Sequence, residues 1–240
     1  MFYMKFLIVS LTIHYSSSLF ASERVFKMNS GAITPLANSD GSGFYNKLTT
    51  EIFNRLNIKH QFHSLPSKRS LINANSGQHD GNIARIKGIE KKWPNLIIIP
   101  ESVIEWEFTA YTKGKFNIPV KNWQSLKPYS VSFIRGWQIY EKNLNNVKQV
   151  QHVRNAPQLF RLLMSGRVQI AMFEKLQASY WFKQLNISPT ALQPAITKKK
   201  LYIYLHKKHK ELVPAMVRAI QQIKQDGRYK KILSSIYQAN

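Results

Sequence analysis

The chain has 240 residues, of which 44% are hydrophobic and 20% are charged, and its formal net charge is +23. This composition is that of a folded protein with one or two cores, and it excludes a disordered polar polymer. The sequence contains no cysteine, which excludes disulfide bonds, thiolate metal sites and cysteine nucleophiles.

The first 21 residues have the three-part pattern of a secretory signal peptide. Residues 1–5 carry one cation, residues 6–13 form a short apolar core, and residues 16–21 provide a small-residue cleavage region. This apolar core is shorter than the roughly 20 residues that span a bilayer. An uncleaved anchor is the alternative. We therefore expect an exported chain that begins at residue 22, without a lipid anchor because no cysteine is available.

The first half of the remaining chain alternates between strand and helix patterns. Phe44, Leu48, Ile52 and Leu56 recur at helical spacing and predict a helix over 45–56. In chain order we expect a strand from Val25 to Met28, this helix, a strand over 58–65, a helix over 68–75, buried strands over 82–85 and 96–99, and a segment over 108–112 that leads away from this lobe.

The second half repeats the alternation. We expect a strand over 129–134, a turn at Arg135-Gly136, a helix, a strand over 147–153, a helix over 157–164, a strand over 168–173, a helix over 175–185, a strand over 201–205 and a long helix from Leu212 that ends at Asp226-Gly227. Strands that alternate with helices imply largely parallel sheets in an α/β fold.

Two segments about 90 residues apart repeat one unit, a helix closed by Ser-Gly and followed by a buried strand. The first contains Ser76-Gly77 and the second Ser165-Gly166, with glycine suited to the left-handed position after a helix end. Alignment of the two units places Arg85 opposite Glu174, each at the carboxyl end of its strand. Open α/β sheets bind ligands at these ends, so the pair predicts a cleft between two lobes.

From about residue 25 to residue 237, the order and spacing of several motifs resemble the family-3 extracellular solute-binding proteins, the periplasmic receptors of polar amino acid transporters. The resemblance rests on Gly43-Phe44 opening a helix that ends in 54–58, Ser76-Gly-x-x-Asp80, Arg135-Gly136, Ser165-Gly-Arg167, Leu201-Tyr-Ile-Tyr and the tail over 226–232.

The resemblance implies a two-lobe α/β fold of periplasmic-binding-protein type II, with two crossing strands as a hinge. Lobe one would contain residues 22–110 and 201–240, and lobe two residues 111–200, with hinges near 111–112 and 198–200. Such a protein closes on a small ligand, and a partner recognises the closed shape.

The resemblance also implies binding positions, and several of them depart from the family pattern. The two aromatic positions fall on Ser67 and near Ile33, so the aromatic sandwich is missing. Lys92 occupies the position of the family's carboxylate-binding arginine, and Arg85 and Lys87 occupy two of its hydroxyl positions. Trp137 replaces the hydroxyl residue that follows Gly136 in the family. Glu174 occupies the position of the ammonium-binding carboxylate. Arg135 and Arg69 complete the candidate ligand-binding set.

Cations at hydroxyl positions favour a ligand with an anionic group, because arginine offers a planar fork to a carboxylate or phosphate. Glu174 keeps an amino acid or short peptide open as the ligand, and Trp137 is placed to stack on an apolar or cationic part. Structural alternatives stay open: Arg85 paired with Glu174 or Asp80, Lys87 and Lys92 facing solvent, and Trp137 in the core of lobe two.

We expect no enzyme activity, no cofactor and no metal. The histidines are scattered without ligand spacing and are expected on surfaces, and neither a nucleophile elbow nor a phosphate loop occurs. A few relatives with this fold are dehydratases, so a dehydratase acting through Glu174 is the enzyme alternative.

The partners implied are a small-molecule ligand and either an ABC transporter permease or a membrane sensor. We expect a periplasmic monomer. The basic residues are short runs spread along the chain rather than a nucleic-acid motif, so no nucleic acid is expected, and attachment to anionic envelope polymers is a hypothesis for the charge.

Overall fold

The computed structural model describes residues 25–114 and 118–238 of the chain, so the predicted signal peptide lies outside the described residues. The strands are β1 (Phe26–Ser30), β2 (His60–Ser64), β3 (Gly81–Ile86), β4 (Leu96–Thr112), β5 (Ser130–Ile134), β6 (Gln149–Val153), β7 (Ile170–Glu174), β8 (Thr190–Ala191) and β9 (Thr197–His206). The helices are α1 (Phe44–Arg55), α2 (Ser67–Asn75), α3 (Gln138–Asn143), α4 (Ala156–Met164), α5 (Lys175–Leu185), α6 (Val213–Gln225) and α7 (Arg228–Gln238), with short 3-10 helices η1 (Ile89–Lys91), η2 (Trp123–Leu126) and η3 (Lys207–Leu212).

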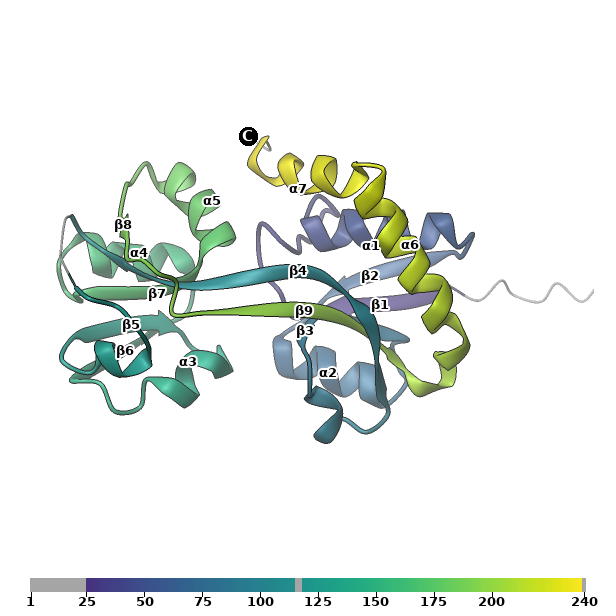
Figure 1. Ribbon diagram of the computed structural model, residues 1–240, viewed down its shortest axis with the longest axis horizontal. Helices are drawn as coiled ribbons and strands as arrows, with labels where there is room; N and C mark the ends of the chain where they lie inside the picture. Colours follow the sequence, from purple (N-terminus) through teal and green to yellow (C-terminus); the bar gives the residue numbers. More distant parts are fainter. Residues whose placement is uncertain (1–24, 115–117, 239–240) are drawn as a thin grey trace, which may run out of the picture.

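Two groups of elements lie side by side and are joined by β4 and β9 (Figure 1). We name β1, β2 and β3 with α1, α2, α6 and α7 lobe one, and β5 to β8 with α3, α4 and α5 lobe two. The sheet order is β2-β1-β3-β9-β4-β7-β5-β6, with β8 added on β4. The β1, β2 and β3 pairs and the β5, β6 and β7 pairs are parallel, while β4 and β9 run antiparallel to their neighbours. The predicted α/β fold class is confirmed.

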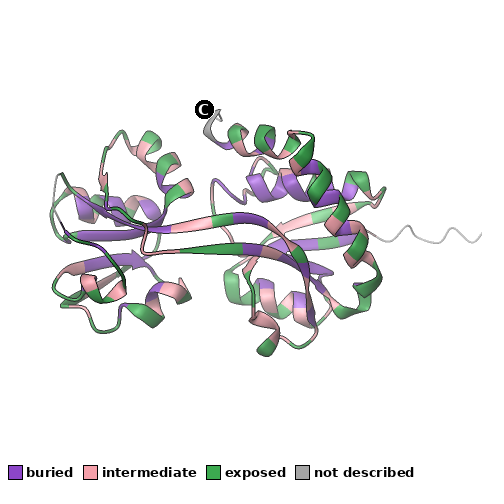
Figure 2. Cartoon of the chain, viewed as in Figure 1, coloured by how far each residue is buried: buried purple, intermediate pink, exposed green. Residues whose placement is uncertain are grey.

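Each lobe has helices on both faces of its strands. In lobe one, α1, α6 and α7 cover one face and α2 the other, and in lobe two α4 and α5 lie opposite α3. The helices bury their sheet-facing sides and expose their outer sides, while the middle of β4 and β9 is largely uncovered (Figure 2). Two separately packed lobes therefore share only the crossing strands and a few contacts between facing elements.

The repeated unit is confirmed. Both Ser-Gly pairs end a helix, α2 and α4, and the glycines Gly77 and Gly166 have φ of 79° and 75°. This left-handed conformation is strained for residues that have a Cβ atom. The chain then enters β3 and β7, as the sequence predicts.

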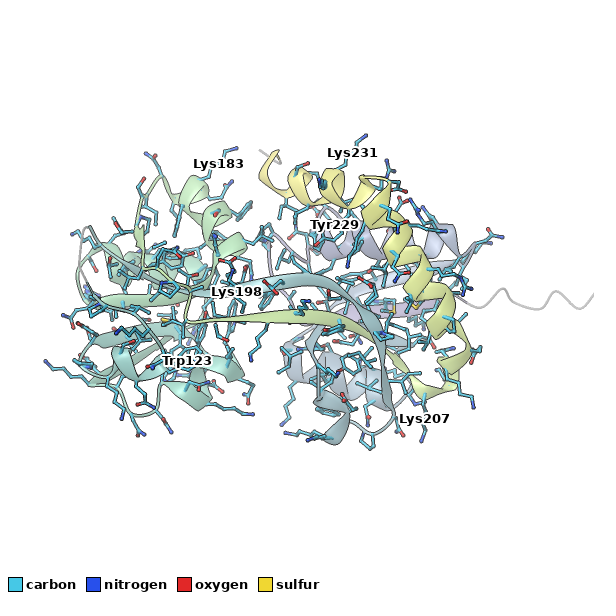
Figure 3. All side chains as sticks on the ribbon, viewed as in Figure 1. Trp123, Lys183, Lys198, Lys207, Tyr229 and Lys231 are labelled. Carbon is cyan, nitrogen blue, oxygen red and sulfur yellow. The ribbon has the colours of Figure 1, made fainter. Side chains whose placement is uncertain are left out.

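The predicted strand over 96–99 and the segment over 108–112 are one continuous strand, β4, of 17 residues. Likewise, β9 begins at Thr197, four residues before the predicted strand. Each strand continues because residues 105–107 pair with residues 198–200 in the space between the lobes, and Lys198 is labelled at this crossing in Figure 3. Local patterning missed these segments because they bury little apolar surface.

One residue of β3 departs from regular strand geometry. Ala84 has a φ of 71°, and the pairing of β3 with β9 shifts register between Ile83 and Arg85, so that Ala84 forms a bulge. Regular alternation would place Arg85 on the same face as Ile83, which is fully buried in the lobe-one core. The bulge instead places Arg85 on the face covered by α2.

We predict that Ala84→Gly does not lower the free energy of unfolding, because glycine adopts a positive φ without the Cβ clash that costs an L-residue about 1–2 kcal/mol. Urea denaturation measures this quantity. The control Ala215→Gly, inside α6, is expected to lose about 1 kcal/mol. Equal losses in both variants would contradict the assignment of strain to Ala84.

Candidate functional site

The Arg85 guanidinium is held at the carboxyl end of β3 by neutral groups. Its Nη1 donates to Ser67 Oγ at 2.9 Å, and its Nη2 donates to Ser70 Oγ at 2.6 Å and to the Ser67 carbonyl at 3.2 Å. Its Nε donates to Asn82 Oδ1 at 2.6 Å. Within residues 25–114 and 118–238 no carboxylate forms an ion pair with Arg85. The alternative in which Arg85 pairs with Glu174 or Asp80 is therefore wrong.

A buried polar network fixes Arg85 from behind. Asn82 Nδ2 donates to Asn29 Oδ1, and Asn29 Nδ2 contacts His79 Nδ1 at 2.8 Å and the Ser70 carbonyl at 3.1 Å. Burial, and then the neighbouring His63, lower the pKa of His79, so the imidazole stays neutral. The network therefore orients the guanidinium without adding a negative charge to it.

The loop after β1 closes over the same guanidinium. A Cβ atom at Gly31 would lie 2.5 Å from Ser67 Cα and 2.8 Å from Arg85 Nη2, so only glycine fits there. Burial lowers the pKa of Arg85 to about 10, because a desolvated cation without a counter-ion is disfavoured. A charge in this state is stabilised by any anion that reaches it.

Glu174 ends β7 and begins α5. Its carboxylate accepts hydrogen bonds from the backbone amides of Leu176, at 2.9 Å, and Gln177, at 3.0 Å, and thus caps the helix. The side chain is buried, and burial outweighs these hydrogen bonds and raises the pKa of Glu174 to about 7. The residue therefore changes its charge near neutral pH, and its capping role was missed from the sequence.

The buried Tyr45 hydroxyl lies close enough to charged residues of both lobes for them to affect its pKa. The Tyr45 hydroxyl, on α1, has a raised pKa through burial and then through Glu174, while Arg85 acts in the opposite direction. Leu176 of α5 also packs against the lobe-one core. Arg85 and Glu174 therefore both lie near Tyr45, where the two lobes meet.

Three buried donors near this point lack hydrogen-bond partners within the described part of the chain. They are the Tyr45 hydroxyl, the Trp106 indole nitrogen and the Tyr140 hydroxyl. Trp106 lies close enough to Tyr45 to influence its pKa, but the contact does not have hydrogen-bond geometry. Buried donors are normally satisfied, and these three atoms are shielded from solvent in this arrangement of the lobes.

Trp137 belongs to an aromatic cluster. Its ring stacks on Tyr140 at 5.5 Å between centroids, on Phe173 at 5.1 Å and on Trp106 at 5.7 Å. Trp137 packs against both hydrophobic clusters of lobe two, which agrees with the alternative that Trp137 belongs to the core of this lobe. Its partner Trp106 also packs against the lobe-one core.

The other sequence-derived candidates are not gathered around Arg85. Arg69, Lys87 and Lys92 have exposed side chains. Gly136, with a φ of 89°, forms the turn after β5, and Arg135 lies at the edge of lobe two beside β6. The solvent-facing alternative for Lys87 and Lys92 agrees with these positions.

Two histidines were wrongly expected on the surface. His79 is buried in the network behind Arg85, and His209 is buried against Asp80, with Nε2 2.7 Å from Oδ1. Burial raises the pKa of Asp80, but the backbone amide of Lys27 and the His209 and Lys208 contacts outweigh it and hold the pKa at about 2. Within the described residues no cluster of three or more His, Asp or Glu side chains is placed to hold a metal ion.

Glu174 gives a pH prediction. The folded state holds its proton up to about pH 7, whereas the unfolded chain releases it near pH 4.5, so stability falls as the pH rises through this window. Glu174→Gln keeps an acceptor for the amides of α5 but cannot ionise. Relative to the unmodified protein, the free energy of unfolding of the variant should be higher by up to roughly 3 kcal/mol at pH 8 and almost the same at pH 4.5.

Urea denaturation from pH 4.5 to 8 measures this difference. Glu105→Gln, which alters an exposed carboxylate, is the matched control and should leave the pH dependence unchanged. An unchanged slope in Glu174→Gln would show that Glu174 does not hold the proton.

Comparisons with known proteins were made for the whole chain. No family model matches it. An uncharacterised protein of Shewanella oneidensis is 29% identical over 192 residues, which cover 76% of this chain and 71% of that protein.

Solved structures resemble the chain over almost its whole length. The substrate-binding protein of an amino acid ABC transporter matches with a TM-score of 0.68 and 17% identity over 90% of this chain and 100% of that one. The GluR0 ligand-binding core in complex with L-glutamate matches with a TM-score of 0.75 and 12% identity, over 89% and 98%. A histidine kinase sensor domain with similarity to periplasmic binding proteins gives 0.73 and 14%, over 88% and 95%.

At these identities the likeness establishes the fold. The resemblance to family-3 solute-binding proteins that the sequence indicates is thereby confirmed. The strand order and the two crossing strands agree with the architecture of the similar solved structures. The chain has the two-lobed fold of the type II periplasmic binding proteins, as the resemblance to family-3 solute-binding proteins implies.

Proposed function

We propose that this protein is a periplasmic solute-binding protein that traps a small anionic or amino-acid-like ligand between its two lobes. The observation that carries the proposal is Arg85, a partly buried cation whose hydrogen bonds all go to neutral groups within the described chain. A ligand carboxylate or phosphate would supply the missing negative charge through a charge-assisted hydrogen bond to the Nη1 hydrogen that these contacts leave free.

The surroundings of Arg85 support an amino-acid-like ligand. Glu174 lies close enough to Tyr45 to raise its pKa, as Arg85 lies close enough to lower it, and an ionised Glu174 would attract an ammonium group. The unpartnered donors of Tyr45, Trp106 and Tyr140 are buried here and would offer further contacts to ligand oxygens if movement of the lobes exposes them. The amino-acid-binding neighbours favour the same class.

Closure of the lobes is proposed to occur at the crossing strands. Glu105, Trp106 and Glu107 pair with residues 198–200 and with no third strand of the described chain, so this ribbon is only two strands wide. Two-stranded ribbons are only marginally stable by themselves, which suits a hinge. The boundaries predicted from the sequence, 22–110 with 201–240 and 111–200, stay a prediction.

A transport receptor and a signalling receptor would both use the same closure of the lobes on a ligand. The amino acid ABC transporter neighbour favours delivery to a permease, and the histidine kinase sensor neighbour is the specific observation in favour of a receptor that signals to a membrane sensor. We infer a binding role rather than catalysis because the named neighbours are binding proteins and domains. Within the described residues no helix has the length and apolar character needed to cross a membrane.

The Arg85 proposal predicts a specific loss of binding. Residues 22–240 are screened by thermal shift against L-glutamate, L-aspartate, L-glutamine, dicarboxylates and short peptides. A ligand at about 100 times its dissociation constant adds roughly 2.7 kcal/mol, which should raise the melting temperature by about 5–10 °C. Isothermal titration of the hit is then expected to show at least about a tenfold weaker affinity for Arg85→Gln, the loss of one or more charge-assisted hydrogen bonds.

Arg218→Gln is the matched control, because it removes an exposed arginine of α6 in lobe one. Arg85→Lys, which keeps the charge without the fork, should show an intermediate loss. Circular dichroism confirms that each variant is folded. Equal affinities of Arg85→Gln and the unmodified protein would refute the role of Arg85.

Export gives a second prediction. When residues 1–240 are expressed in a Gram-negative host, intact mass measurement of the periplasmic fraction should find a chain that starts at Ser22. Ala21→Arg, which places a large cation before the cleavage position, should leave the longer chain in the membrane fraction. A full-length chain in the cytosol would contradict periplasmic localisation.

A further inference from the structure

A hollow of about 480 Å³ lies at the outer edge of lobe two, between β6 and α4. β6 is the last strand in the sheet order and pairs only with β5 among the described strands. All residues that line the hollow belong to lobe two: Arg135, Gln151, His152, Val153, Arg154, Gln158, Arg161, Leu162 and Arg167. Its volume is within the range of roughly 300–1,000 Å³ that is typical of small-molecule sites.

The lining is selectively rich in arginine. The chain contains 10 arginines and 25 lysines, yet four arginines and no lysine line this hollow. A general excess of positive charge would place mainly lysine there. Arginine differs from lysine in having a planar fork that binds oxyanions through two parallel hydrogen bonds.

The four arginines come from separate parts of lobe two and converge because the backbone is fixed at each point. Arg135 N donates to the Val153 carbonyl at 2.9 Å, and Arg154 N donates to Gln158 Oε1 at 3.0 Å. Arg167 N donates to the Leu162 carbonyl at 3.0 Å, in the turn that ends α4.

Helical spacing directs the side chains of α4 into the hollow. Gln158, Arg161 and Leu162 lie on the side opposite the buried residues Leu159 and Leu163, one turn apart along the helix. Leu162 and Val153 add apolar side chains to a lining that is otherwise polar or cationic.

Within the described residues, the carboxylate of Glu141 shares a neighbouring pocket with Arg135 and His152 but does not line the hollow. The lining contains no aspartate or glutamate, and none of the four arginines forms an ion pair with another residue in the part of the chain that the structure describes. The guanidinium groups are thus available to an external oxyanion, and their mutual repulsion is relieved when one binds.

We propose that this hollow is a second binding site, separate from the space between the lobes, for an oxyanion with several negative charges of the phosphate type. The occupant carries two or more phosphate groups and is either free in solution or part of a lipid headgroup. Because the whole lining belongs to lobe two, occupancy does not require closure of the lobes. The high positive charge of the chain then increases the rate of encounter with such anions.

Isothermal titration of residues 22–240 with sodium tripolyphosphate, in 50 and 150 mM salt, tests the proposal. We expect saturable binding with one anion per chain, weaker in the higher salt. Arg161→Gln with Arg167→Gln is expected to weaken binding at least tenfold. These two residues were chosen because neither belongs to the candidate set between the lobes.

Arg218→Gln with Lys230→Gln removes the same charge from exposed positions of lobe one and should change the affinity less than twofold. Arg161→Lys with Arg167→Lys keeps the charge, so an intermediate loss identifies the arginine fork as the recognition element. Thermal melting verifies that every variant is folded. Equal losses in the lobe-one and lobe-two Gln variants would overturn the proposal, because binding would then follow net charge alone.

Flotation with phosphatidylcholine vesicles that contain 20% cardiolipin distinguishes the two sources of phosphate. Flotation that the Arg161 and Arg167 substitutions abolish, without tripolyphosphate binding, assigns a lipid headgroup. Tripolyphosphate binding without flotation assigns a free anion. The absence of both refutes the site. Loss of the interlobe ligand response in the Arg161 and Arg167 variant would refute the independence of the two sites.

Discussion

The antiparallel pairing of β4 with β9 is the constraint on which the rest of the structure depends. Both strands enter each lobe, where β9 pairs with β3 on one side and β4 pairs with β7 on the other. Each lobe therefore completes its sheet on the same two strands. Between the lobes the pair stands alone over residues 105–107 and 198–200, where Glu107 forms ion pairs with Lys175, at 3.1 Å, and Lys198, at 2.9 Å. This short ribbon is therefore the place where we propose that the lobes move, while the core of each lobe stays packed.

The candidate site follows from a departure from regular strand geometry. The bulge at Ala84 moves Arg85 out of phase with Ile83 and directs it to the serines of α2. A non-glycine residue at positive φ costs free energy, and such strain is concentrated at functional sites. The hydrogen bonds of Arg85 and the tight approach of Gly31 hold the guanidinium in place, but none of these contacts supplies a counter-charge. The candidate site is therefore fixed in geometry and carries a charge without a counter-ion among the described residues, which supports the proposed recognition of an anion.

The lysines and arginines that give the chain its positive charge are distributed differently in the structure. Most lysines are spread over exposed positions, where they are hydrated and screened by salt. Five of the 10 arginines lie at the two candidate sites, with one partly buried beside Ser67 and Ser70 and four around the hollow beside β6. Net charge alone would attract polyanions without discrimination. The arrangement of guanidinium groups is the basis of the oxyanion selectivity that we propose at two separate places.

The sequence by itself determined the alternation of helices and strands, the repeated helix-Gly-strand unit, and the placement of Arg85 and Glu174 at strand ends, because apolar periodicity and helix-end glycines are local signals. It did not determine that β4 and β9 are continuous, since residues 105–107 and 198–200 are defined by their pairing rather than by burial. Nor did it reveal the bulge at Ala84, the capping role of Glu174, the burial of His79 or the convergence of Arg135, Arg154, Arg161 and Arg167. Each of these depends on contacts between residues far apart in the chain, and only the tertiary structure brings such residues together.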